Sequence, residues 1–290
     1  MPCGCPVHKT DRIEFKRMQI RQSAQFAEKV RLENILNREL RPLFNQVLSD
    51  FRTTVAAFGT PPNAGQFRPR FESVLSNHYQ RVQRAFKNVI IEDNGGKAFF
   101  NIVCKQDENQ RNTLIDLALL EFRNQGATNQ AILISQTNER QARQAIQLAR
   151  QQIIDDGGDL EPTALALAAS VILSRNLFVR SNTIAITETQ WAAEATKSIT
   201  ASVSAGNAPF NLGQEFRVPT DTPVDITKRW DDRDDNRVRD THKAVDQTTL
   251  PEDGVFIVGS SRLRFPRDAS FGAAIREVIN CRCEANYSFA

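Results

Sequence analysis

Apolar side chains recur at helical spacing along the first part of the chain. From about Asp11 to Phe58 they fall on one broad face of an amphipathic helix. The stripe consists of Ile35, Leu36, Leu40, Leu43, Phe44, Val47, Leu48, Phe51, Val55 and Phe58. Because proline disfavours helical geometry in the residue before it, Pro42 predicts a kink or a division of this helix near Arg41.

Three more helices are predicted before residue 159. The stretch GTPPNAG ends the first helix, and a second apolar stripe runs from Phe67 to Ile90. A third helix is expected over Glu108–Asn124 and a fourth over Asn138–Ile154, both with Gln-rich polar faces. The turn sequence DDGGD follows them. Residues 1–158 are therefore expected to form a mainly helical, basic region.

Beyond Asp159 the pattern of apolar positions changes. The stretch EPTALALAASVILSRNLFV is almost continuously apolar and predicts a helix buried on several sides, with Pro162 in its first turn. A second helix follows, for which Ser181 or Asn182 is available as the N-cap.

The last part of the chain predicts short strands. They are DITKRW, GVFIVG and REVINCRCEANY, and a charged helix from Asp232 to Val245 lies between the first two. Alternation within GVFIVG supplies a buried face, so Phe256 and Phe265 are expected in the core. These patterns predict an α+β fold class: a helical N-terminal region followed by a small α+β C-terminal domain with short strands, over residues 159–290.

Composition narrows the class of protein. The 290 residues are 40% hydrophobic, enough to bury a core, and no run approaches the roughly 18 consecutive apolar residues that cross a membrane. Charges stand near the N-terminus, where a secretory signal would be apolar. We therefore expect no membrane partner and a protein that stays in the compartment where it is made.

The net charge of +3 is modest but unevenly distributed. Between Lys9 and Ile91 there are 15 Lys and Arg against 7 Asp and Glu. This half of the chain either faces an acidic partner, nucleic acid included, or forms a solvated basic helix surface.

Two thiols stand one residue apart near the C-terminus, at Cys281 and Cys283. Five cysteines are an odd count, so reduced thiols are expected. On a strand both sulfurs would project to one side. Structural zinc takes four Cys or His ligands, and His242 is the one histidine in the C-terminal half.

The missing zinc ligand has a candidate source at the other end of the chain. Cys3, Cys5 and His8 form a second C-x-C with a histidine. One metal joining both ends, two separate sites and no metal at all remain open. Without metal, the C-terminal thiols would pack as small hydrophobes and His242 would bond to a carboxylate or a carbonyl.

The charged stretch before His242 also has two interpretations. Arg237 and Arg239, among several Asp residues, form either a buried ion-pair network or a solvated helix surface. Trp230 is expected to anchor the start of this helix against the sheet.

Four stretches together carry a family resemblance: RSNTIAITET, KRWDDRDDNRVRDTH, VFIVGSSRLRFPRD and EVINCRC. In this order they resemble the C-terminal domain of the phage Mu F-like minor head proteins, the phage head morphogenesis family, over about residues 165–283. The chain departs from the family pattern in two places. Its acidic-glycine turn comes late, at Glu252-Asp253-Gly254, and Ile186-Thr187-Glu188 stands where the family has Arg-Thr-Glu.

The resemblance implies a structural minor head protein, not an enzyme, involved in procapsid and head morphogenesis of a tailed bacteriophage. It further implies association with the portal protein, contacts with capsid or scaffold proteins and with packaged double-stranded DNA, and a location in the virion head interior, with the host cytoplasm as the place of assembly. Its motif residues are Glu188, Trp230, Arg237, Arg239 and Asn280.

A genome-delivered effector enzyme is the alternative function. Arg180 ahead of Thr187-Glu188 distantly resembles the arginine and glutamate of ADP-ribosyltransferase toxins. The chain contains no G-x-x-x-x-G-K-[ST] nucleotide loop and no G-x-S-x-G elbow. A Cys-His nucleophile pair that uses His242 is the remaining catalytic possibility.

Overall fold

The computed structural model describes residues 7–93, 108–207, 209, 225–233 and 236–289. Within these ranges the side chains of residues 7–22, 64, 91, 93 and 108 are outside the description. The chain has an α+β fold, with a long helical N-terminal region and a C-terminal region of short antiparallel strands, as the sequence predicts.

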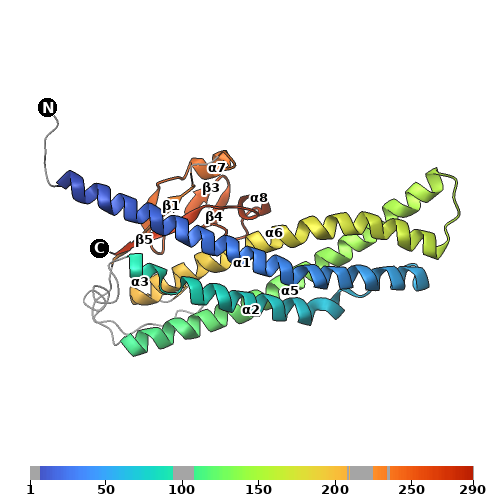
Figure 1. Cartoon of the computed structure of the whole chain (residues 1–290), viewed down its shortest axis with the longest axis horizontal. Helices are drawn as coiled ribbons and strands as arrows, with labels where there is room; N and C mark the ends of the chain where they lie inside the picture. The colour runs from blue at the N-terminus through green and yellow to red at the C-terminus, as the bar shows by residue number, and fades with distance from the viewer. Residues whose placement is uncertain (1–6, 94–107, 208, 210–224, 234–235, 290) are drawn as a thin grey trace.

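Four long helices form an antiparallel bundle in which each helix runs opposite to the one before it (Figure 1). They are α1 (Val7–Phe58), α2 (Arg68–Phe86), α5 (Glu108–Asp155) and α6 (Pro162–Ser204). The short helices η1 (Ala64–Phe67) and α3 (Val89–Asp93) flank α2. We call the four long helices the bundle.

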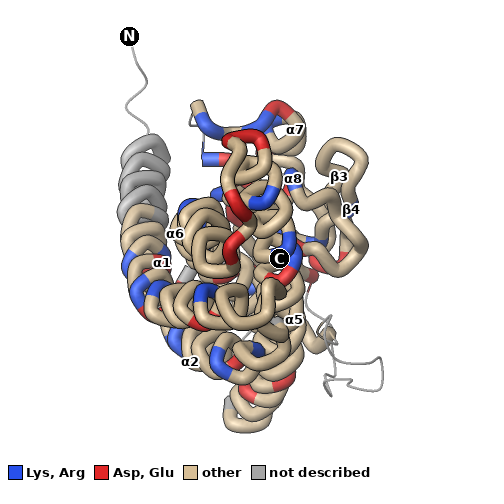
Figure 2. The backbone as a smooth tube through the Cα atoms, turned by 90° about the vertical axis from the view of Figure 1, so that its right-hand side faces the viewer, with Lys and Arg blue, Asp and Glu red and all other residues tan. Residues whose placement is uncertain are grey.

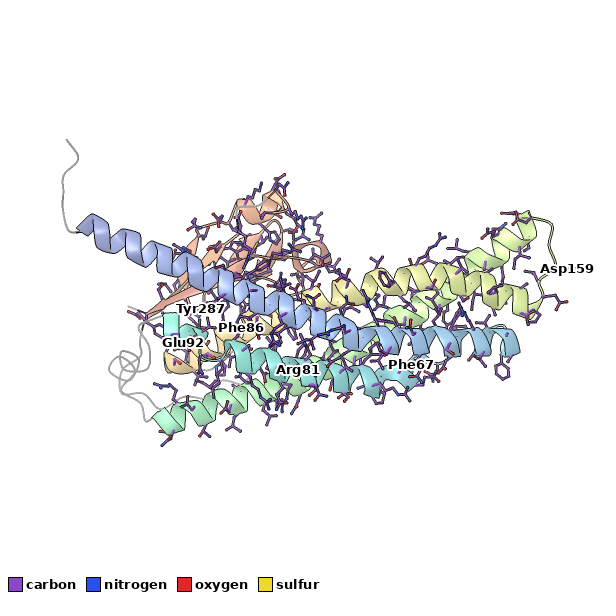
Figure 3. The ribbon with its side chains drawn as sticks, in the orientation of Figure 1. Phe67, Arg81, Phe86, Glu92, Asp159 and Tyr287 are labelled. Carbon is purple, nitrogen blue, oxygen red and sulfur yellow. The ribbon has the colours of Figure 1, made fainter. Side chains whose placement is uncertain are left out.

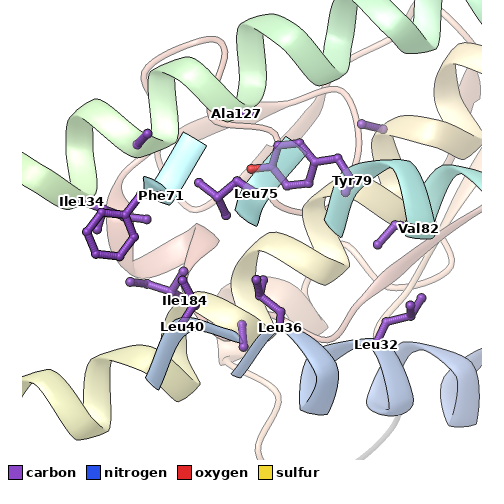
Figure 4. Close-up of a cluster of buried hydrophobic side chains, with 14 of the residues drawn as sticks. Leu32, Leu36, Leu40, Phe71, Leu75, Tyr79, Val82, Ala127, Ile134 and Ile184 are labelled. Carbon is purple, nitrogen blue, oxygen red and sulfur yellow. The ribbon is translucent and has the colours of Figure 1, made fainter. Parts of the chain in front are cut away.

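The bundle core follows from the apolar stripes of the sequence. Leu32, Leu36 and Leu40 of α1 face α2 across a layer of fully buried side chains (Figure 4). Phe44 and Phe71 extend this contact, with ring centroids 5.3 Å apart. Burial of one face of each helix is the main favourable term for such a core.

Helix α1 continues through Pro42, so the predicted division near Arg41 is not observed. A proline within a helix costs one hydrogen bond and a steric clash, roughly 3 kcal/mol. Leu40, Phe44 and Val47 are buried on both sides of it, and this burial keeps the segment helical.

The third and fourth predicted helices are one helix, α5. Gly126, which stands in the predicted gap, is a packing residue and not a helix end. A Cβ atom there would lie 3.1 Å from the Trp191 ring and 3.2 Å from the Tyr79 ring. The glycine therefore lets α5 approach these two aromatic side chains closely.

The two helices predicted after Asp159 are also one helix, α6. Ser181 is not an N-cap: its hydroxyl donates to the Phe178 carbonyl within the helix, and it lies 3.0 Å from Asn37 Oδ1 of α1. The predicted boundary between residues 158 and 159 falls in the turn between α5 and α6, and α6 packs as the fourth helix of the bundle.

The first half of α6 is buried on one face only, whereas the sequence predicts burial on several sides. The apolar first half exposes Leu167, Val171, Phe178 and Val179, whereas residues 192–205 are buried almost without interruption. The second half is buried because the C-terminal strands cover the face that the other helices leave open (Figure 1). By length and composition alone α6 also qualifies as a segment able to cross a membrane, a test that buried core helices pass as well.

Residues 225–289, which we call the module, contain two small antiparallel sheets. β1 (Ile226–Asp231) lies between β2 (Thr249–Pro251) and β5 (Glu284–Phe289). β3 (Phe256–Val258) pairs with β4 (Ser261–Leu263). Two single-turn helices, α7 (Asp240–Lys243) and α8 (Ile275–Val278), complete it.

Two predicted elements of the module are shorter than expected. The charged helix from Asp232 to Val245 is reduced, within the described residues, to α7, because Arg239 has an extended backbone at its N-cap. The predicted last strand is divided into α8 and β5, since Asn280 adopts a left-handed conformation with φ of 53°.

The module is attached to the bundle through the outer edge of β5. The Ala285 N–H donates to Glu194 of α6 at 2.9 Å, and the Ala285 carbonyl accepts from Lys197 of α6 at 3.1 Å. Lys29 of α1 lies 2.9 Å from Glu194 and 3.1 Å from Glu284, and all three side chains are buried. Side chains of the bundle thus satisfy an edge that strands otherwise leave open.

Charges on the surface are mixed. Figure 2 shows Lys and Arg positions interspersed with Asp and Glu along the bundle helices on the side that it presents. Several opposite charges pair directly, as in Arg81 with Glu39 and Lys87 with Asp116. Among the residues that the structure describes, basic positions thus alternate with acidic ones on this side.

Candidate functional site

Three side chains of the module form a buried group that could bind a metal: His242, Cys281 and Cys283. We call this group the cluster. The His242 Nδ1 atom lies 3.3 Å from Cys283 Sγ and 3.5 Å from Cys281 Sγ. All three ligand atoms lie within 4.8 Å of one another, and the three side chains are almost fully buried. The sequence prediction that these residues belong together is confirmed.

Short irregular segments position the two cysteines. They lie between α8 and β5, not on the strand that the sequence predicts. The left-handed Asn280 turns the chain just before Cys281, and its N–H donates to Thr187 Oγ1 of α6 at 3.4 Å. Arg239, beside α7, donates to the Ile279 carbonyl at 2.5 Å. Both sulfurs consequently face His242, although a strand does not hold them.

Glu277 fixes the orientation of the histidine. Its Oε2 atom lies 3.1 Å from His242 Nε2 and accepts a hydrogen bond from the Thr241 hydroxyl at 2.8 Å. Burial alone raises the pKa of Glu277, but the Thr241 hydrogen bond and the interaction with His242 lower it below its usual value. The carboxylate contacts Nε2 and thereby fixes the ring, so that Nδ1 faces the two sulfurs.

The two thiols differ in their protonation. Burial raises the pKa of Cys281, but the Cys283 hydrogen bond, the Arg267 charge and His242 together bring it well below its usual value. The hydrogen bond to Cys281 and burial raise the pKa of Cys283. Without metal, Cys281 is therefore the more acidic of the two thiols.

Aromatic and charged side chains enclose the cluster. The Trp230 ring meets His242 edge-on at 5.6 Å and Phe256 at 5.1 Å. Arg267, fully buried and left-handed with φ of 73°, donates to Gln190 of α6 at 3.0 Å. Trp230 of β1 thus forms a wall of the cluster, and its contact with His242 holds α7 against the sheet.

The remaining predicted residues lie elsewhere. Arg237 is exposed in the turn before α7. Glu188 is buried in the bundle, where the Tyr79 hydroxyl donates to it at 2.5 Å and burial raises its pKa to about 7. Cys3 and Cys5 lie outside the described residues, as does the side chain of His8. The proposed joining of the two chain ends through one metal therefore stays a prediction.

The residues that suggested ADP-ribosyl transfer are not arranged around a common opening. Arg180 donates to Asn138 and to the Ile134 carbonyl of α5, and Glu188 bonds to Tyr79 of α2. The transferase alternative stays an untested prediction, and these contacts give the two residues a packing role inside the bundle.

Sequence reasoning missed two components of the site, Glu277 and Arg267. Glu277 stands four residues before Cys281. A carboxylate so close in sequence to a Cys-His group could have indicated that Glu277 belongs to the site. Arg267 gave no such signal, because its burial results from the turn that Asp268 stabilises. That carboxylate accepts from the Arg264 N–H at 3.1 Å and the Ser270 N–H at 2.9 Å.

Chemically, the arrangement suits a soft metal ion or a fixed hydrogen-bonded core. Cys281 and Cys283 are each only 2% exposed. Three hollows of the described surface, of 360 to 560 Å³, are lined by bundle residues and contain no residue of the cluster. None of these three hollows leads a substrate to the two cysteines.

Comparison with known proteins adds no relative: no family model, no curated protein and no solved structure matches the chain.

Proposed function

We propose that the chain is a structural minor head protein of a tailed bacteriophage, which takes part in procapsid and head morphogenesis. The observation that supports it is that residues from two of the stretches that carry the resemblance meet in one place. Trp230 and His242 stand at the two ends of one of the resembling stretches, and the Cys281–Cys283 pair stands in another; all four contact one another in one buried centre. These residues are buried and packed against one another, and they present no exposed reactive group. Such an arrangement suits an architectural role.

In this proposal the module is a rigid docking unit, and the bundle reaches the partners. The partners are the portal protein, capsid or scaffold proteins and packaged double-stranded DNA; a membrane is not among them. The protein would assemble in the host cytoplasm and remain in the head interior near the portal. Mixed charge on the bundle favours protein contacts over extensive phosphate contacts, because DNA binding relies on accumulated Lys and Arg.

The cluster carries a finer proposal, a structural zinc ion. A neutral His nitrogen and two sulfurs are ligands that zinc prefers, and zinc–sulfur and zinc–nitrogen bonds of about 2.3 and 2.0 Å suit ligand atoms about 3.5 Å apart. The observed Nδ1–Sγ distances of 3.3 and 3.5 Å fit this requirement. Glu277 supplies the carboxylate that zinc-bound histidines usually contact. The described residues provide three ligands within this group.

Localisation in particles tests the main proposal. Procapsids and mature heads are purified from infected cells that carry either the wild-type gene or the Cys281→Ser/Cys283→Ser variant, and the chain is quantified by mass spectrometry. We expect the wild-type protein in both particles and a strong loss of the variant. A Cys104→Ser variant serves as the matched control. Wild-type protein that is found only outside particles would refute the assignment.

Elemental analysis tests the zinc proposal separately. Purified wild-type protein should contain stoichiometric zinc, and the double serine variant should lose both the zinc and thermal stability. Glu277→Gln should keep the ligands but weaken zinc binding about 10- to 100-fold. Metal-free wild-type protein with an unchanged melting temperature after chelation would assign the thiols to packing alone.

A further inference from the structure

The first half of α6 exposes an apolar stripe in the part of the bundle that the module does not cover. Leu167, Val171 and Phe178 are spaced by four and seven residues, so they lie on one helix face, with Val179 beside them. Leu167, Phe178 and Val179 are each more than 60% exposed. This region lies toward the end of the bundle that Asp159 marks in Figure 3, far from Tyr287 of the module.

The stripe borders a hollow between α1 and α6, which we call the groove. Its volume is about 560 Å³. Phe44 and Leu177 are buried and form its floor, while Leu48 and Phe178 line its sides. The groove is therefore apolar at its base and open to solvent.

Polar contacts between α1 and α6 lie on both sides of the groove. On one side Arg52 donates to Ser170 at 2.9 Å. On the other, the Ser181 hydroxyl lies 3.0 Å from Asn37. The lining residues of α1 run from Arg41 to Leu48, about 10 Å at 1.5 Å per residue, so the hollow fits about two turns of a helix.

The charge around the groove has one sign. Arg41 and Arg175 are exposed at its edges, and no lining residue is acidic. The Arg41 guanidinium lies 4.8 Å above the Phe178 ring. The sequence from Pro162 to Thr187 contains no Asp or Glu at all. An occupant with carboxylates beside its apolar side chains would complement these edges.

We propose that the groove binds an amphipathic helical segment of another protein, with apolar side chains on one face bordered by Asp or Glu. Its apolar residues would contact Phe178, Val179 and Leu48, and its carboxylates would pair with Arg41 and Arg175. This mode uses a helix in an apolar groove, which proteins employ widely for recognition. The inference rests on the groove itself and stands whether or not the chain belongs to a phage head.

Binding of a synthetic peptide to the full-length protein tests the proposal. The probe is a fluorescein-labelled 15-residue helix with Leu on one face and Glu on both borders; a second probe has Lys in place of every Glu. Fluorescence anisotropy should show at least about tenfold tighter binding of the Glu peptide, because Arg41 and Arg175 attract its carboxylates and repel the Lys side chains of the other peptide.

Two groove variants and one control sharpen the test. Phe178→Ser/Val179→Ser should weaken binding of the Glu peptide about tenfold or more, as loss of central apolar contacts does. Arg41→Glu/Arg175→Glu should invert the preference toward the Lys peptide. Ile257→Ser/Ile275→Ser removes equally exposed apolar side chains from the module and should change nothing. All substituted side chains are exposed, and melting temperatures verify that the variants fold.

Five outcomes would overturn the proposal. The wild-type protein could bind neither peptide, or both equally. The groove variants could bind as tightly as the wild type. Sedimentation without peptide could show that the wild type is a dimer which Phe178→Ser/Val179→Ser converts to a monomer; the occupant would then be a second copy of the chain. Flotation with phosphatidylglycerol vesicles that depends on the same two residues would identify a lipid surface instead.

Discussion

The bundle and the module reach stability by different means. The bundle buries a long series of apolar side chains that repeat along four helices, so each contributes a small share of the whole. The module core beside it consists of Trp230, Phe256, Val258, Leu263, Cys281 and Cys283. Ile226, Phe265, Ala285 and Tyr287 of the module belong to the core of the bundle instead. Because the module's own core is small and supplies little hydrophobic stabilisation, its stability depends on this shared contact and on a few polar contacts. Single changes should therefore alter the free energy of unfolding more in the module, and in the buried ion pairs of Lys29 that connect it to the bundle, than in the bundle itself. We call these ion pairs the joint.

The largest expected effect is at the joint. Lys29→Met removes the buried cation that lies beside both Glu194 and Glu284. Leaving buried carboxylates undercompensated should lower the free energy of unfolding by about 3 to 5 kcal/mol, measured by guanidinium denaturation. The control Arg31→Met removes an exposed pair with Glu28 and should cost less than about 1 kcal/mol. If both changes lower the free energy of unfolding by the same small amount, the joint does not determine stability.

Two buried glutamates should give opposite dependences on pH. Burial raises the pKa of Glu188 to about 7, whereas Glu284, despite its burial, has its pKa lowered by Lys29, Lys197 and Arg233. Between pH 4.5 and 7 the folded protein holds a proton on Glu188 that the unfolded chain has released, so this contribution to stability falls as pH rises. The Glu284 contribution is present above pH 4.5 and is lost as pH falls below it.

Glu188→Gln isolates the first of these effects. At pH 8 the variant should be more stable than the wild type by about 3 kcal/mol, and the difference should shrink toward pH 4.5. Urea unfolding at several pH values measures it, with Glu139→Gln, on the surface of α5, as the control. A difference that is constant with pH would contradict the raised pKa.

The same substitution in the two regions compares their cores directly. Trp230→Phe should cost about 2 kcal/mol, because the small module core cannot close the resulting cavity. Trp191→Phe should cost about 1 kcal/mol, since Trp191 is only partly buried and packs against Phe122 and Tyr79 of the bundle. Chemical denaturation measures both. A larger loss from Trp191→Phe would reverse the comparison.

The smallest expected effect lies inside the bundle. Gly126→Ala gains helix propensity but forces its methyl group against Trp191 and Tyr79. We expect a net loss of about 1 kcal/mol, seen as a lower melting temperature. Asn129→Ala on the exposed face of α5 gains propensity without this contact and should stabilise slightly. If both substitutions stabilise equally, the close approach at Gly126 carries no strain.

The sequence predicts the helical class of the bundle but not its helix boundaries. Apolar periodicity is a local signal, and it correctly indicates helices around Leu36, Phe71 and Ile146. Pro42 and Gly126 also act locally as breakers, but burial on both sides outweighs them. The first half of α6 is less buried than predicted, because burial depends on where the module lies, and apolar periodicity does not indicate this.

The sequence predicts the three candidate metal ligands of the site but not the residues that surround them. Few residue types suit a soft metal, so the single histidine of this half and the paired thiols could be placed together from the sequence. Glu277 and Arg267 depend on turns: a single-turn helix carries the first, and a left-handed residue is required for the second. Such turns form because of contacts between segments that are distant in the sequence, so no local sequence pattern predicts them.

Helix α6 runs without interruption from the groove to the edge of β5 that it contacts. The directions in which side chains point at its two ends are therefore fixed relative to each other. Inserting a single residue between Ser181 and Thr187 would rotate one end against the other by about 100° and lengthen the helix by about 1.5 Å. Seven inserted residues would restore the facing to within about 20°. The spacing between the two contact regions is thus constrained in residue number as well as in residue identity.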